Sequence, residues 1–167
     1  MKRNIYISYI HSDSMNFKFK IMDKFKGRKY KFSDEENDTT RDVLKSEESL
    51  LKLEKKISRM DVTVVLISRN ILESTQIPFE VKYSLDNQFS DTPKGVIGVV
   101  IPDKGNDYSY IMKKGMKGIW GVDKSKLPSI ISSNLHNEVV LQNKHNINYD
   151  SFLSVYRWED FVKDFEN

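Results

Sequence analysis

Glu80 is the residue of this sequence whose position best suits it for chemistry, because it follows a run typical of a buried strand. Residues 62–67 read Val-Thr-Val-Val-Leu-Ile without polar alternation, as in a central strand covered on both faces of a parallel sheet. Ligands of such sheets bind at the carboxyl ends of the strands, where the loops converge. An acidic side chain just beyond this strand could therefore stabilise positive charge on a bound ligand.

The helix that carries Glu80 is predicted to run from Gln76 to about Asn87, with Pro78 in its first turn, where a missing N–H does no harm. Glu80 is expected in this opening turn, near the positive end of the helix dipole, which would hold the carboxylate anionic. The plainer interpretation is that Glu80 is an ordinary acid at a helix N-terminus, and spacing alone favours that interpretation.

Strands and helices are predicted to alternate along the chain. Strands are expected at residues 4–9, 29–32, 62–67, 95–101 and 152–156. The first helix is expected to follow a loop at residues 11–14. Four more are expected: from Glu47 to about Arg59, where Ser46 is the cap, from Gln76 to about Asn87, from Pro128 to about His136 and from Trp158 to Phe165. Residues 33–46 are predicted to form a long polar loop, and residues 104–127 have no assignable pattern.

This alternation predicts an α/β fold, a flavodoxin-like, doubly wound and mostly parallel sheet of five strands in a single domain spanning residues 1–167. In the flavodoxin-like order the direction of winding reverses between the first and third strands. The crevice at that point is expected to lie between residues 8–13 and residues 68–80.

The composition excludes several classes of site. The 167 residues include no cysteine, which rules out thiolate catalysis and makes a zinc site improbable for three histidines without metal spacing. Neither a Walker loop nor a G-x-G-x-x-G turn is present. No apolar run approaches the ~20 residues of a membrane span, so a cytoplasmic protein is expected. Lysines crowd residues 18–31, but a solvated helix face explains them better than a nucleic-acid site.

Several segments together resemble one family, the TIR-like domains of bacterial Thoeris antiphage defence, the ThsB group. These segments are residues 5–9, 54–68, 76–81, 95–102 and 154–161. The resemblance implies the fold derived above and an activity on NAD+ as substrate, without a further cofactor or metal. Enzymatic TIR domains cleave the nicotinamide glycosidic bond with one glutamate on the helix after the third strand, the position of Glu80.

The same resemblance implies a role in signalling. Thoeris members convert the remainder of NAD+ into a cyclic ADP-ribose signal for a separate effector, and TIR enzymes often act across two protomers, so self-association is expected. An aromatic residue commonly neighbours the glutamate, and Phe79 fits that place. Two other functions stay open: a non-catalytic TIR-like interaction module, and an enzyme similar to nucleoside deoxyribosyltransferases, which also depend on a glutamate.

A single carboxylate suits the NAD+ reaction, because nicotinamide leaves as a neutral molecule and needs no general acid, unlike the two-carboxylate glycosidases. The ribosyl carbon is left with positive charge, which a fixed anion stabilises. The substrate contacts expected at the strand ends are Tyr6, Ser8, Tyr9 and His11 after the first strand and Asn106 after the fourth.

Each of these contacts has a simpler explanation. Tyr6 and Tyr9 are ordinary strand residues, and one of the two must face the core. Ser8 could form hydrogen bonds to the backbone alone, and His11 could equally be a loop residue without a ligand. The acidic stretch 34–42 could gate the site or could be a solvated loop.

Overall fold

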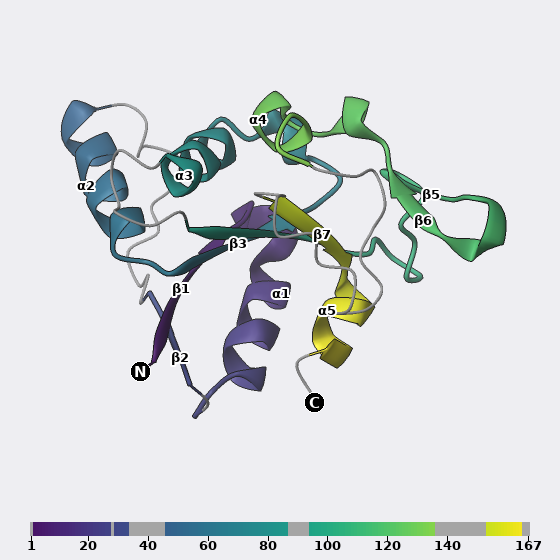
Figure 1. The fold of residues 1–167 in the computed structure, drawn as a ribbon, viewed down its shortest axis with the longest axis horizontal. Helices are drawn as coiled ribbons and strands as arrows, with labels where there is room; N and C mark the ends of the chain where they lie inside the picture. The colour runs from purple at the N-terminus through teal and green to yellow at the C-terminus, as the bar shows by residue number, and fades with distance from the viewer. Residues whose placement is uncertain (1, 28, 34–45, 87–93, 136–152, 165–167) are drawn as a thin grey trace.

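A five-stranded parallel sheet forms the centre of the molecule (Figure 1). The computed structural model describes residues 2–27, 29–33, 46–86, 94–135 and 153–164. The strands are β1 (Arg3–Ser8), β2 (Tyr30–Phe32), β3 (Val62–Ile67), β4 (Gly95–Val100) and β7 (Leu153–Arg157). Their order, β2-β1-β3-β4-β7, with every neighbouring pair parallel, confirms the flavodoxin-like sheet. Winding therefore reverses between β1 and β3, as predicted.

Helices cover both faces of this sheet (Figure 1). On one face lie α2 (Glu47–Ser58), α3 (Gln76–Leu85) and α4 (Ser129–Ser132), and on the other lie α1 (His11–Lys24) and α5 (Trp158–Asp164). Alternate residues of β3 supply the two cores: Val65 and Ile67 pack with α3, whereas Val64 and Leu66 pack with α1 and α5. A strand buried on both faces needs such a continuous apolar sequence.

Most predicted boundaries are confirmed within two residues, and two are not. The Ser46 hydroxyl caps α2 by accepting a hydrogen bond from the backbone N–H of Ser49. The predicted loop at residues 11–14 is wrong, because α1 already begins at His11, with Ile10 as an N-cap that provides no side-chain hydrogen bond. Helix α4 ends at Ser132 rather than near His136. The acidic stretch 34–42 lies outside the described residues.

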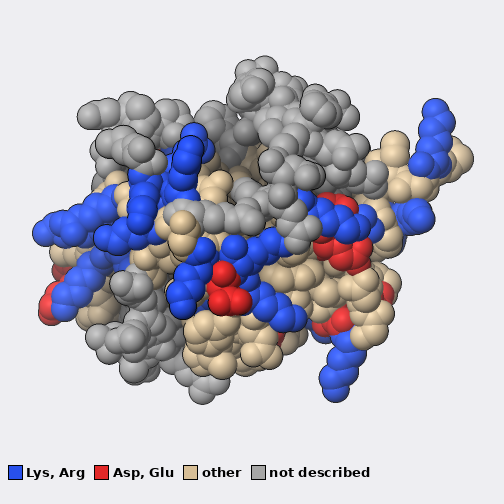
Figure 2. Space-filling model, turned by 90° about the horizontal axis from the view of Figure 1, so that it is seen from below, with Lys and Arg blue, Asp and Glu red and all other residues tan. Residues whose placement is uncertain are grey.

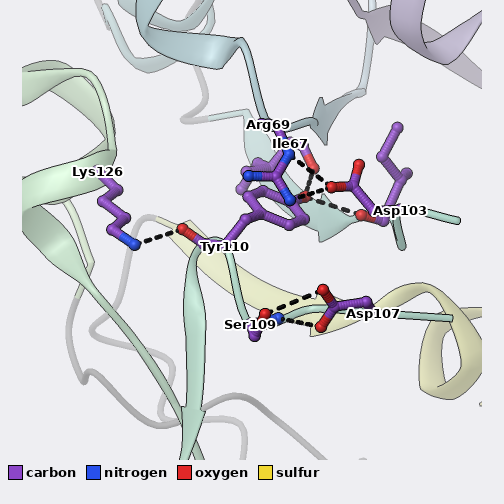
Figure 3. A network of polar contacts seen from close by, with 8 residues as sticks. Ile67, Arg69, Asp103, Asp107, Ser109, Tyr110 and Lys126 are labelled. Carbon is purple, nitrogen blue, oxygen red and sulfur yellow. Dashed lines mark hydrogen bonds and ion pairs between the residues drawn. The ribbon is translucent and has the colours of Figure 1, made fainter. Parts of the chain in front are cut away.

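Residues 104–127, which the sequence left unassigned, contain an antiparallel hairpin of β5 (Met112–Lys114) and β6 (Trp120–Val122). Tyr110 joins this region to the sheet (Figure 3). Its hydroxyl lies 2.9 Å from the carbonyl oxygen of Ile67 and 2.8 Å from that of Ile101, so one proton is shared between the ends of two strands. Burial raises the pKa of Tyr110 above its usual range.

Lysine and arginine side chains gather on the face where α1 lies, with acidic side chains among them (Figure 2). Exposed lysines on α1 and in the turn that follows it include Lys20 and Lys26. Within the described residues, no helix is both long and apolar enough to cross a membrane.

Candidate active site

The carboxylate of Glu80 is buried and surrounded by hydrogen-bond donors. Only 2% of the residue is exposed. Its Oε1 accepts a hydrogen bond of 2.6 Å from the Tyr6 hydroxyl and another of 2.6 Å from Nε2 of Gln76, while its Oε2 accepts one from the Ser8 hydroxyl. Three donors from two elements match an ionised carboxylate, which can only accept. The arrangement supplies hydrogen-bond donors to both oxygens of the Glu80 carboxylate.

The alternation of β1 explains why Tyr6 and Ser8 meet Glu80. Successive strand residues point to opposite faces, so Ile7 packs under α1 while Tyr6 and Ser8 both face the helices of the other layer. Both side chains are at most 3% exposed. On α3, Gln76 and Glu80 are four residues apart and therefore share one helix face. The site is thus built where β1 and β3 adjoin, at the reversal of winding.

The expectation that Glu80 lies in the opening turn of its helix is wrong. Helix α3 begins at Gln76, so Glu80 starts the second turn, and the first turn has no acidic residue. The dipole effect fades within the first turn. The direct donors Tyr6, Ser8 and Gln76, rather than the helix N-terminus, therefore stabilise the anion.

A second hydrogen-bonded pair holds the backbone of Glu80. The Ser84 hydroxyl lies 2.8 Å from the carbonyl oxygen of Glu80, to which it donates, and 2.7 Å from the Thr63 hydroxyl. Thr63 is completely buried and Ser84 is 2% exposed. Because the Ser84 proton is used by Glu80, Thr63 is the donor within the pair. The chain of bonds ties the backbone of α3 at Glu80 to the central strand β3.

The two walls predicted for the crevice are also joined by a hydrogen bond. Ser68 follows β3, and its hydroxyl donates to Oδ2 of Asp13 at 2.9 Å. Asp13 lies in the first turn of α1. Segments 8–13 and 68–80 therefore border the same edge of the sheet, as the topology predicted.

Three of the predicted contact residues lie away from the carboxylate. Tyr9 packs with the cluster under α1, on the opposite side from Tyr6, and its hydroxyl is 3.2 Å from Nζ of Lys18. His11 is exposed, with its ring centroid 6.2 Å from that of Tyr9. Phe79 is 39% exposed, since neighbouring helix residues point about 100° apart. Of the predicted set, only Tyr6 and Ser8 contact Glu80.

Asn106 belongs to a different hollow. Its amide donates to a carboxylate oxygen of Glu159, and it lines a cavity of about 820 Å³ beyond the ends of β4 and β7. Tyr108 and Trp120 also line this cavity, but no residue of β1 or α3 does. Burial raises the pKa of Tyr108 to about 12. The backbone N–H of Glu159 acts in the opposite direction and lowers the pKa of Tyr108. Within the described residues, the geometry gives the Tyr108 hydroxyl no hydrogen-bond partner.

Sequence reasoning missed Gln76, Ser84 and Thr63 as parts of the site. Helical spacing could have identified two of them, because Gln76 and Ser84 each lie four residues from Glu80 and so share its face of the predicted helix. Nothing in the sequence distinguished Thr63 from the other residues of the predicted central strand. Among the described residues, no group of three or more His, Asp or Glu side chains could hold a metal ion.

A comparison with protein families agrees with this architecture. Residues 6–106, more than half of the chain, match the model described as Thoeris protein ThsB, TIR-like domain. The match includes the carboxyl end of β1 together with β3, α3 and β4, and so it covers Tyr6, Ser8 and Gln76, the donors to Glu80 described above. A search of curated proteins gave no match. The chain belongs to the ThsB TIR-like domain family of the Thoeris defence system.

Proposed function

We propose that this protein is an NAD+-consuming enzyme that cleaves the bond between nicotinamide and ribose, with Glu80 as its catalytic carboxylate. The observation that carries the proposal is the hydrogen-bonded anion at the reversal of winding in an open parallel sheet, where such folds bind ligands. Membership of the ThsB TIR-like family supports the choice of NAD+ as substrate. No other cofactor or metal is needed for this chemistry.

The chemistry requires one anion. The bond between the ribosyl carbon and the ring nitrogen breaks, its electron pair stays on nitrogen, and the cationic ring leaves as neutral nicotinamide. Positive charge then develops on the ribosyl carbon and ring oxygen, where a preorganised carboxylate stabilises it. Water can add to that carbon and release a proton, or a nitrogen of the adenine in the same molecule can add and close a ring.

The ring closure is the outcome we propose for a Thoeris protein. Its product would be a cyclic ADP-ribose type of signal, read by a separate effector protein in antiphage defence. Such a protein would work in the cytoplasm, where NAD+ is available, and self-association of like domains would fit the family. Tyr6 and Ser8 would then serve to fix the carboxylate, since both hydroxyls already bond it.

The two alternatives make different predictions for one experiment. Purified protein, alone and with extract of phage-infected cells, is incubated with NAD+ or with a panel of 2′-deoxynucleosides, and free nicotinamide or free base is measured by chromatography. Nicotinamide released from NAD+ supports the proposal. Free base from deoxynucleosides supports the deoxyribosyltransferase-like reaction instead, and neither product under any condition favours an interaction module.

A further inference from the structure

Gln76 differs from the other two donors to Glu80 in how easily it can move. Tyr6 and Ser8 are on β1, which is hydrogen-bonded to β2 on one side and β3 on the other, and both side chains are almost fully buried. Gln76 is the first residue of α3 and is partly exposed. Its side chain has three rotatable bonds and can turn toward solvent without disturbing the core.

A substrate can reach the buried carboxylate only if a group around it moves. Glu80 is 2% exposed, and its Oε1 is shared by Tyr6 and Gln76. Ribose presents hydroxyl groups, which can donate to a carboxylate oxygen as the Gln76 amide does. Replacing one donor by another keeps the buried charge satisfied at each stage, which avoids the cost of an unpaired anion.

We infer that Gln76 is an exchangeable positioning residue: its amide holds Oε1 of Glu80 before substrate binds and gives up this place to a hydroxyl of the bound sugar. The inference rests on the proposed function for the identity of the sugar substrate. Gln76 thus competes with the substrate for Glu80, while Tyr6 and Ser8 keep the carboxylate in position throughout.

The competition predicts a specific kinetic pattern. Gln76→Ala and Gln76→Asn both remove the hydrogen bond to Glu80. In Gln76→Asn the amide remains, but the side chain is one methylene too short to reach the carboxylate. Each should lower KM for NAD+ about three- to tenfold, the equivalent of one modest hydrogen bond, with kcat changed less than about twofold. Thr75→Ala is the matched control, because exposed Thr75 makes no side-chain cap bond at the same helix end. A higher KM in Gln76→Ala would overturn the inference.

A second measurement does not depend on NAD+. Glu80 is labelled with a water-soluble carbodiimide and an amine, and its modification rate is followed by peptide mass spectrometry, with exposed Glu48 as internal reference. Labelling of Glu80 should be several-fold faster in Gln76→Ala than in the wild type or Thr75→Ala, at unchanged thermal unfolding temperature. Equal rates would overturn the inference. Faster labelling without nicotinamide release from any variant would support the exchange and contradict the NAD+ proposal alone.

Discussion

The hydroxyl of Tyr6 donates a 2.6 Å hydrogen bond to Oε1 of Glu80 across 74 residues of sequence. Both side chains are buried, at 3% and 2% exposure. The bond connects the first strand to the helix behind the third, which are the two elements on either side of the reversal of winding. This bond therefore links the stability of the contact between β1 and α3 to the geometry of the proposed catalytic carboxylate.

Removing this hydroxyl should therefore affect both stability and activity. Tyr6→Phe keeps the ring but takes one charge-assisted donor from Glu80, so the free energy of unfolding should fall by about 1–3 kcal/mol. Nicotinamide release should fall by about tenfold, because a less restrained carboxylate is less well placed. Urea unfolding and initial rates with NAD+ measure the two effects.

Tyr9→Phe is the matched control, since the Tyr9 hydroxyl contacts Lys18 on the other side of the sheet. We expect its rate of nicotinamide release to equal that of the wild type. A loss of activity in Tyr9→Phe as large as that in Tyr6→Phe would show that the carboxylate environment described here is not the site of reaction.

The pair of Thr63 and Ser84 allows a test of how the backbone of Glu80 is held. Ser84→Ala removes the bond to the Glu80 carbonyl and leaves the completely buried Thr63 hydroxyl without its partner. We expect a loss of about 1–3 kcal/mol in unfolding free energy. Thr63→Val added to Ser84→Ala removes the orphaned hydroxyl and should cost less than the sum of the single changes.

Denaturant unfolding of the two single variants and the double variant gives the coupling energy directly. Additive losses would mean that the 2.7 Å contact between the two hydroxyls contributes nothing to stability. A coupling of at least about 0.5 kcal/mol, the lower end for groups in one hydrogen-bond network, is the result we expect.

The sheet could be predicted from sequence because its signals are local and strong. The apolar run of β3 matches the observed strand, Val62–Ile67, and the Ser46 cap fixed the start of α2. Residues 104–127 could not be assigned because β5 and β6 are three residues each and depend on tertiary contacts such as that of Tyr110 with the ends of β3 and β4. The start of α1 was missed because Ile10 provides no side-chain cap.

The site was predicted only in part for a similar reason. Tyr6 and Ser8 were predicted as contacts at the end of the first strand, and strand alternation puts both on the face of β1 that meets Glu80. Tyr9 and His11 were included because they are close in sequence, but Tyr9 points to the opposite face from Tyr6 because strand residues alternate, and His11 is the first residue of α1. Asn106 was chosen for its position after β4, which does not reveal that it faces the cavity beside β7.

Tyr110 and Tyr108 differ in their partners and so should respond differently to loss of the hydroxyl. Tyr110→Phe removes hydrogen bonds to two strand-end carbonyls and should cost about 1–3 kcal/mol at pH 7. The Tyr108 hydroxyl has no hydrogen-bond partner in the described structure, so Tyr108→Phe should change stability by less than about 0.5 kcal/mol. Urea unfolding at pH 7 distinguishes the two.

Alkaline pH adds a second comparison. Burial raises the pKa of both phenols, to about 12 for Tyr108, above the value of about 10 in unfolded chains. The neutral forms therefore stabilise the fold fully below pH 10, and this contribution is lost as pH rises through the folded pKa values. Each Phe variant should show a shallower fall of stability between about pH 10 and 12 than the wild type. An unchanged slope would indicate that these phenols ionise as freely in the folded protein as in the unfolded chain.

In the proposed reaction the buried carboxylate of Glu80 stabilises a ribosyl cation, and the variant Glu80→Gln removes its negative charge. Glutamine has the same shape, and its amide oxygen can still accept from Tyr6 and Gln76 while its NH2 faces the Ser8 oxygen, so the variant should remain folded. Under conditions in which the wild type releases nicotinamide from NAD+, we expect a rate at least about 100-fold lower for Glu80→Gln. A folded Glu80→Gln protein that releases nicotinamide at the wild-type rate would show that the charge of Glu80 is not needed for the reaction.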